Sequence, residues 1–191
     1  MMESVTQIEQ LVERIAVDND KKAYEQLFHQ FYDKLLRFAC SLLKQEEVAE
    51  ETVSDVFVNI WRNRANLHTI GNLQTYLYVS TRNLCMRYLG RMQKNNALSL
   101  NTINSEFLSS SYQTPEEKLL SAEMVLKIET AIEKLPPQCR LIFALIKENG
   151  LRYKEVAHIL NLSVKTVEAQ MAIATKRIHS AVGIAFIHLK N

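Results

Sequence analysis

Apolar residues recur at three- and four-residue steps along almost the whole of this 191-residue chain, and that spacing is the period of an α-helix. Only four glycines and three prolines are present, too few for the many turns of a β-rich or loop-rich fold. No segment shows the apolar–polar alternation of a strand. The sequence therefore predicts an all-α protein, with helices over residues 22–44, 46–63, 72–94, 115–134, 138–148, 153–160 and 164–182. Asn149-Gly150 is expected to end the helix over residues 138–148 with a left-handed cap.

A polar segment between residues 95 and 114 interrupts this pattern. Serine, threonine and asparagine fill 11 of its 20 positions, and Pro115 follows it. A structureless loop of this length is uncommon inside one compact domain, whereas polar segments often connect domains. The sequence therefore predicts two small helical domains, residues 1–94 and 116–191, joined by a flexible linker over residues 95–115.

The charges are unevenly divided along the chain, although the net charge is only +2. Residues 1–55 carry 12 acidic and 6 basic residues, whereas residues 56–105 carry 6 basic residues and no acidic one. Because a carboxylate repels phosphate, an acid-free basic segment favours a polyanion as partner. A solvated basic surface without any partner is the alternative.

Motifs of the common enzyme classes are missing. The sequence has no glycine-rich phosphate loop, His-Glu-x-x-His or Gly-x-Ser-x-Gly motif, and its five histidines are scattered. The widely spaced Cys40, Cys85 and Cys139 suit buried free thiols better than a metal site or a disulfide framework. The N-terminus is polar and acidic, unlike a secretory signal, and no apolar run is long enough to span a membrane. The sequence therefore predicts a cytoplasmic, non-enzymatic protein with no catalytic residue, cofactor or metal.

Residues 153–171 have the pattern of a helix-turn-helix. Ala157 is small where two helices would cross, Asn161 tolerates the left-handed backbone of a tight turn, and Ser163 is a natural cap for the second helix. In such a unit the second helix enters the major groove of DNA; an ordinary helical hairpin is the alternative. A small core is expected from Val156, Leu160, Leu162, Val167 and Met171. The candidate DNA contacts are Ser163, Lys165, Thr166, Glu168, Gln170, Lys176 and Arg177.

The expected helix over residues 46–63 has apolar residues on more than one side near its end. A pure core role would explain them, but an apolar surface edged by polar groups is also typical of a docking site for a partner helix. The candidate partner contacts are Asp55, Val56, Phe57, Asn59, Ile60 and Trp61.

Residues 63–94 combine a polar loop with tyrosines and arginines. Rings that stack on bases and cations that follow the backbone are suited to unpaired nucleic acid. Tyr76, Tyr78 and Tyr88 would alternatively pack in the core. The candidate contacts in this segment are Asn66, His68, Thr69, Asn72, Tyr76, Arg82, Arg87 and Arg91.

Four segments in this order resemble the bacterial RNA polymerase sigma factors of the extracytoplasmic-function (ECF) class. They are residues 28–43, 49–61, 76–84 and 135–140, the last leading into the helix-turn-helix. The resemblance extends over about residues 20–185. The Tyr-Leu-Tyr and Arg-Asn-Leu residues of the third segment are most similar to the branch that pairs with transmembrane anti-sigma proteins.

The resemblance implies a role for each segment. Residues 55–61 would dock on the clamp coiled coil of core RNA polymerase, and residues 63–94 would melt and hold the minus-ten promoter element. The helix-turn-helix would read the minus-thirty-five element, and an anti-sigma factor, membrane-anchored in the most similar branch, would be a further partner. The reading helix departs from the family at Ala169, Ala172 and Ala174, where longer polar residues are common.

Two other classes of protein fit parts of the sequence. A helix-turn-helix transcriptional regulator with a helical sensor domain would explain residues 153–171, but it leaves the acid-free segment without a purpose. A phosphorelay or adaptor protein that only mimics a sigma factor would not need a basic reading helix. Binding to core polymerase distinguishes the sigma factor from both.

Overall fold

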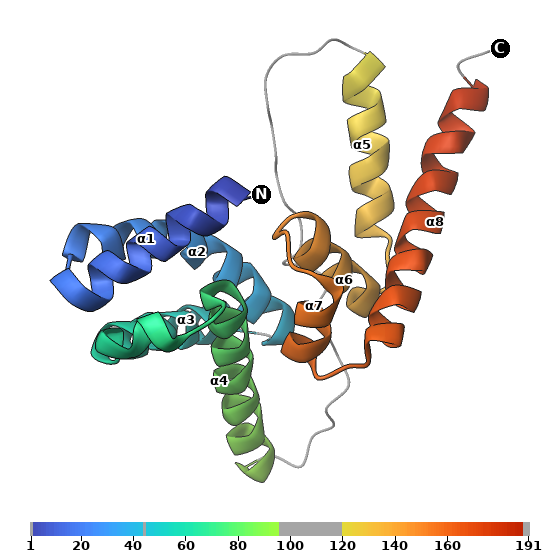
Figure 1. Cartoon of the computed structure of the whole chain (residues 1–191). Helices are drawn as coiled ribbons and strands as arrows, with labels where there is room; N and C mark the ends of the chain where they lie inside the picture. Colours follow the sequence, from blue (N-terminus) through green and yellow to red (C-terminus); the bar gives the residue numbers. More distant parts are fainter. Residues whose placement is uncertain (1, 44, 96–119, 189–191) are drawn as a thin grey trace. The chain divides into compact units, whose positions relative to one another are not determined.

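A computed structural model describes residues 2–43, 45–95 and 120–188 of the chain, which divides into two compact units, Met1–Thr102 and Ile103–Asn191 (Figure 1). All regular structure in the described residues is helical, which confirms the predicted all-α class. Apart from Asn95, the predicted linker over residues 95–115 lies outside the described residues, as do residues 115–119 of the next predicted helix.

The first unit is a bundle around the long helix α2. Helix α2 packs against α1, α3 and α4, and α1 also packs against the short 3-10 helix η1 (Figure 1). One stripe of α2 supplies much of the core because its buried residues are spaced by three or four, including Leu27, Phe31 and Phe38. The described elements are α1 (Met2–Asp18), α2 (Lys21–Leu42), α3 (Glu46–Arg62), η1 (Arg64–Thr69) and α4 (Leu73–Asn95).

Tyr78 belongs to this core. Its side chain is fully buried, and its ring meets that of Phe38 edge to face, with the centroids 5.2 Å apart. Of the three tyrosines expected either to stack on bases or to pack inside, Tyr78 packs inside.

Helix α1 was not predicted from the sequence. Leu11 and Ile15 bury one side of it, and Asn19 ends it in a left-handed conformation with φ 52°. Asp20 then caps α2, because its carboxylate accepts hydrogen bonds from the backbone N–H groups of Lys22 and Ala23 at 2.8 and 3.1 Å. The guanidinium of Arg14 in α1 also contacts this carboxylate, at 2.6 and 3.0 Å. The cap and this ion pair lower the pKa of Asp20 and join the end of α1 to the start of α2.

The second unit is arranged around α8. Helices α5, α6 and α7 each pack against it. Gly150, with φ 71°, forms the turn after α6, and Asn161, with φ 55°, forms the turn between α7 and α8. Both turns confirm the left-handed positions predicted from the sequence. The described elements are α5 (Leu120–Glu133), α6 (Pro137–Lys147), α7 (Tyr153–Leu160) and α8 (Val164–His188).

The three cysteines are buried and free, as predicted. Burial raises the pKa of Cys40 to about 11 and that of Cys85 to about 12, so both thiols stay protonated at neutral pH. Among the described residues, no helix has both the length and the apolar character that crossing a membrane requires.

Candidate functional site

Helices α7 and α8 form the predicted helix-turn-helix. The turn is closed by backbone hydrogen bonds from Leu162 N–H to the Ala157 carbonyl at 2.9 Å and from Asn161 N–H to the His158 carbonyl at 3.3 Å. Ser163 caps α8, since its hydroxyl oxygen accepts a hydrogen bond from the backbone N–H of Thr166 at 3.0 Å. This cap confirms the structural role predicted for Ser163 and occupies the hydroxyl that the sequence analysis also proposed as a DNA contact.

The exposed side of α8 is set by its buried residues. Val167, Met171 and Ala174 are buried against the rest of the unit. Lys165 and Lys176 lie on the opposite side of the helix and face the solvent. Among the other candidate contacts on α8, Glu168 and Arg177 are exposed, whereas Thr166 and Gln170 are half-buried at the edge of this surface.

The candidate docking surface on α3 contains fewer residues than the sequence predicted. Val56, Phe57 and Ile60 are only 1–2% exposed, because that side of α3 packs against α2 and α4. Their side chains are core residues and not surface contacts, which corrects the prediction for these three. Asp55 and Asn59 remain exposed on the opposite side of the helix, and Trp61 is half-buried at its edge.

Aromatic rings from α2 extend this surface beyond α3. Phe28 lies 4.7 Å from both Tyr32 and Phe57, measured between ring centroids, and Tyr24 lies 4.9 Å from Trp61. The rings of Tyr24, Phe28 and Tyr32 are half-buried and so still reach the surface. They were not among the predicted contacts, although their four-residue spacing places them along one side of α2.

Trp61 is held between two neighbours. Tyr24 covers one part of the indole, and the Arg64 guanidinium carbon lies over the ring at 4.5 Å from its centroid. Arg64 also donates hydrogen bonds to the Trp61 carbonyl at 2.9 Å and to the Asn19 side chain at 2.5 Å. These contacts join the end of α3 to the turn between α1 and α2.

The polar loop at the start of residues 63–94, predicted to contact the minus-ten element, is not an open coil. Arg64–Thr69 form the short 3-10 helix η1. Leu67 is buried and anchors it, while Asn66, His68 and Thr69 are exposed around it. The side-chain oxygen of Asn72 accepts a hydrogen bond from Thr75 N–H at 2.9 Å, so Asn72 caps α4, and its predicted DNA contact stays a prediction.

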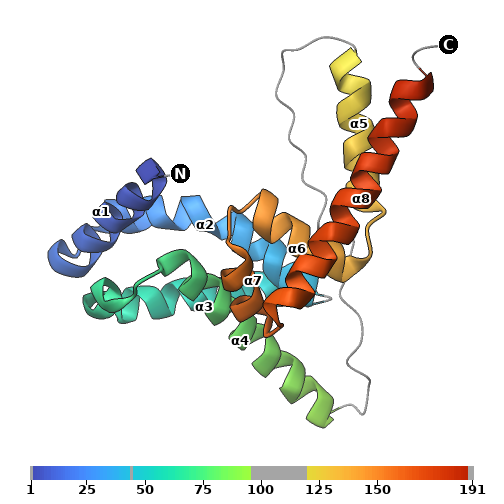
Figure 2. The same ribbon diagram turned by 45° about the vertical axis from the view of Figure 1, so that its right-hand side comes forward.

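Helix α4 places two of its three candidate arginines on the same side as the exposed Tyr76, further along the helix. Tyr76 is 42% exposed at the start of the helix. Arg87 and Arg91 are exposed and lie within about 60° of it around the helix axis. Arg82 lies about 120° away around the axis and is half-buried. The later turns of α4 extend beyond the other helices of the first unit (Figures 1 and 2).

A cavity of about 520 Å³ lies between α1 and the segment that joins η1 to α4. Helix α1 forms one wall with apolar Ile8 and Val12 and acidic Glu9 and Glu13, and the other wall runs from His68 to Gln74. The walls therefore combine apolar surface with groups that accept hydrogen bonds.

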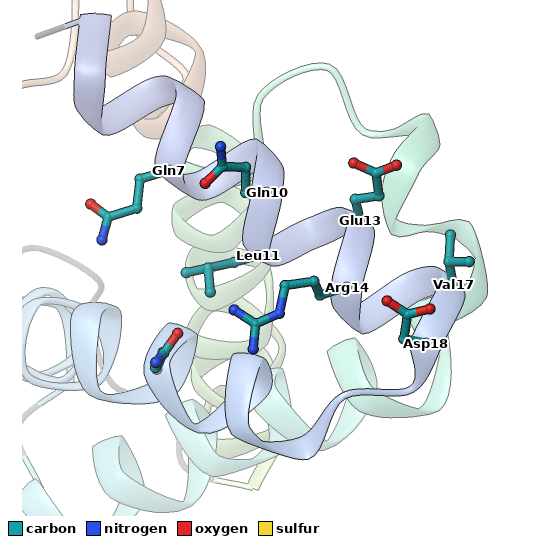
Figure 3. Close-up of a pocket in the computed structure, with 8 residues that line it drawn as sticks. Gln7, Gln10, Leu11, Glu13, Arg14, Val17 and Asp18 are labelled. Carbon is teal, nitrogen blue, oxygen red and sulfur yellow. The ribbon is translucent and has the colours of Figure 1, made fainter.

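A second cavity of about 440 Å³ lies along α1 and reaches Gln26 of α2. Six of its eight lining residues are polar, and Figure 3 shows Arg14 extending from α1 towards α2 while Glu13 points to another side of the helix. None of the candidate contact residues lines this cavity.

Comparison with known families identifies both units. Residues 27–95 match the model described as Sigma-70 region 2, and residues 126–178 match that described as Sigma-70, region 4. The two matches together cover more than half of the chain. This chain belongs to the sigma-70 family. Curated relatives named ECF sigma factors place it in the ECF class, as the sequence predicted.

Two curated relatives align with this sigma factor over nearly its whole length. The ECF RNA polymerase sigma-E factor of Escherichia coli is 25% identical over 184 residues, which span 91% of this chain and 96% of the relative. The RNA polymerase sigma-H factor of Pseudomonas aeruginosa is 24% identical over 181 residues, which span 92% and 93%.

Two solved structures share the fold. One is the sigma factor RpoE in complex with the anti-sigma factor NepR from Bartonella quintana, with a TM-score of 0.52, 20% identity, and coverage of 85% of this chain and 98% of that chain. The other is CnrH in complex with the cytosolic domain of CnrY, with a TM-score of 0.54, 19% identity, and coverage of 93% and 98%. The region 2 match begins at residue 27, so α1 of this sigma factor lies outside it.

Proposed function

We propose that this ECF sigma factor binds core RNA polymerase and directs transcription initiation at specific promoters. One observation carries the proposal. The region 4 match contains a capped helix-turn-helix with a basic outer surface, and the region 2 match of the same chain contains most of the acid-free basic segment. We further propose that it acts in the cytoplasm, where the polymerase acts, and catalyses no bond chemistry itself.

We propose that core polymerase docks on the exposed side of α3. Asp55 and Asn59 supply polar groups there, and Trp61 with the half-buried rings of α2 supplies apolar area at the edge. Aromatic side chains at the centre of an interface often carry much of its binding energy. Phe57 supports this surface from beneath, because its buried ring packs against Phe28.

We propose that the first unit holds the melted minus-ten element. The cavity between α1 and the η1–α4 segment has room for one unstacked base, and Tyr76 is exposed nearby on α4 for stacking on another. Arg87 and Arg91 would follow the backbone of the same strand along α4. Asn66, His68, Thr69 and Asn72 remain candidates for contacts around the cavity, and Arg82 is a weaker candidate because of its position.

We propose that α8 reads the minus-thirty-five element in the major groove. Lys165 and Glu168 lie near the start of the helix, where a reading helix meets base edges. Lys176 and Arg177, further along, would contact phosphates. Thr166 and Gln170 lie at the edge of this surface, and Ser163 supports it as the cap.

We also propose an anti-sigma partner for this chain, membrane-anchored as in the branch that its third segment resembles. One of the similar structures described above is a sigma factor bound to an anti-sigma factor, and the other is CnrH bound to the cytosolic domain of CnrY. The chain, captured with a tag from detergent-solubilised cells, should carry a membrane protein. That protein, once purified, should inhibit transcription directed by the chain.

Run-off transcription tests the central proposal. Core polymerase with the chain should produce discrete transcripts from a genomic promoter library, and core polymerase alone should not. A helix-turn-helix regulator with a sensor domain would bind duplex DNA without core polymerase and would produce no such transcripts. Failure of the purified chain to bind core polymerase would favour that alternative.

A further inference from the structure

The outer surface of the reading helix is apolar at its centre. Ile173 is 41% exposed, and the exposed Ala169 and Ala172 flank it on the same side of α8, so that the three form one apolar patch. No core function explains Ile173, because the core side of the helix is formed by other residues, including Val167 and Met171.

Basic residues lie on both sides of this apolar centre along the helix, and the exposed Glu168 lies beside it. Lys165 lies before it, and Lys176 and Arg177 lie after it, all exposed. At 1.5 Å per residue the two lysines are about 16 Å apart along the helix, which is enough to reach phosphates on both sides of a major groove about 12 Å wide. The basic charges therefore favour nucleic acid as the partner of this surface. The side chains of its apolar centre, Ala169, Ala172 and Ile173, have no group that could form hydrogen bonds with base edges.

The major groove offers one apolar group to such a surface. Thymine alone presents a methyl group there, on C5, and small or apolar side chains are its usual contacts. The short side chains of Ala169 and Ala172 also permit close approach of the helix backbone to the base edges. Residues 169–173 span about 6 Å along the helix, which corresponds to about two base pairs.

We infer that Ile173, with Ala169 and Ala172, selects one or two adjacent thymines in the upstream promoter element by contact with their C5-methyl groups. This inference rests on the proposed function of α8. It makes the specificity of this chain depend on apolar contacts, two of them at Ala169 and Ala172, where the resemblance leads one to expect longer polar side chains.

Replacement of thymine by deoxyuridine tests the inference, because uracil pairs identically and lacks only the methyl group. Holoenzyme assembled from core polymerase and the full chain would first select its best upstream element from a duplex library randomised there. Each thymine of that element would then be replaced singly. One or two adjacent replacements should weaken binding about four-fold each, the effect expected for losing one buried methyl group.

The variant Ile173→Ala should bind the thymine duplex more weakly and should reduce the uracil effect to less than about two-fold, as a double-mutant cycle requires for a direct contact. Ile173→Val keeps most of the apolar surface and should keep most of the uracil effect. The matched control is Leu126→Ala on α5, which removes an apolar side chain that is 62% exposed and should leave both quantities unchanged.

Three results would overturn the inference while leaving the proposed function intact. These are a selected element without thymine, uracil replacements that are all neutral, and a uracil effect that persists unchanged in Ile173→Ala. If the holoenzyme instead enriches no upstream element over random duplex, the role proposed for α8 is overturned, and the inference with it.

Discussion

The two candidate DNA-contacting surfaces of this sigma factor differ in construction. In the second unit the surface is one side of a regular, capped helix, opposite the buried Val167 and Met171. In the first unit it combines a 3-10 helix, a cavity walled by α1, and exposed side chains along α4. A rigid helix suits the groove of an intact duplex, whereas a cavity beside an exposed ring suits bases that have left the stack.

This difference gives the α1 helix a purpose. The reading helix needs only its own core to hold it, but the loop of the first unit needs a second wall. Helix α1 packs directly against η1 and supplies that wall with Ile8, Val12 and two glutamates. Under the proposed function, recognition of unpaired bases would thus involve residues far apart in the sequence, and recognition of the duplex would involve neighbours along one helix.

The largest expected effect separates core from surface within α3. Phe57→Ala should destabilise the first unit by about 3–5 kcal/mol, because truncation of a buried ring leaves a cavity. Chemical denaturation of the full chain should show an early transition for the first unit and an unchanged one for the second. The matched control is Val58→Ala, at a position that is 43% exposed and should change stability little. A stable, normally folded Phe57→Ala protein would show that this ring is not a core residue.

Asp55→Arg should have the next largest effect, on docking and not on folding. Asp55 is exposed on α3, so reversal of its charge should weaken binding to core polymerase by about 2 kcal/mol while leaving the melting curve unchanged. Binding can be measured by fluorescence anisotropy of the labelled chain. Asp18→Arg, at an exposed acid on α1, is the matched control. Equal losses in the two variants would point to overall charge and not to a docking surface.

Tyr76→Ala should weaken promoter opening by about 1–3 kcal/mol, the usual contribution of one base stacked on an aromatic ring. A template with a preformed bubble over the minus-ten element should restore much of the lost transcription. The same template should not rescue Lys165→Ala where the upstream contact is required. If the bubble rescues both variants or neither, the division of labour between the two units is wrong.

Ser163→Ala should destabilise the second unit by about 1 kcal/mol, since it removes the cap of the reading helix. Thermal unfolding followed by circular dichroism measures this change. Ser180→Ala removes the same hydroxyl from an exposed position within α8 and should not destabilise the unit. Equal effects of the two changes would remove the argument that Ser163 acts as a cap.

The smallest expected effect concerns the arginines of α4. Arg87→Ala should reduce the slope of log affinity against log salt concentration by about 0.7, the contribution of one phosphate contact on a single strand. Arg82→Ala, on another side of the helix, should change the slope less. Titration of a bubble template with holoenzyme at several salt concentrations provides both slopes. A larger change for Arg82 would place the backbone path on the other side of α4.

Features that depend on short stretches of chain were predictable from the sequence. The periodicity of apolar residues located the helices from α2 onwards, and Asn161, Gly150 and Ser163 marked turns and a cap that the structure confirms. Each of these signals acts through the backbone of its immediate neighbours, so the residues that determine it lie next to one another in the sequence.

Which side of a helix meets solvent was decided only by the tertiary structure. The stretch over residues 55–61 is apolar on more than one side, and only the packing of α2 and α4 shows that Phe57 is buried and Asp55 is not. The cavity wall that α1 contributes likewise follows from contacts between distant segments of the first unit. Burial depends on which distant segments pack against a residue. Helical periodicity predicts only that the apolar side of a helix packs against some other segment, and does not say which one.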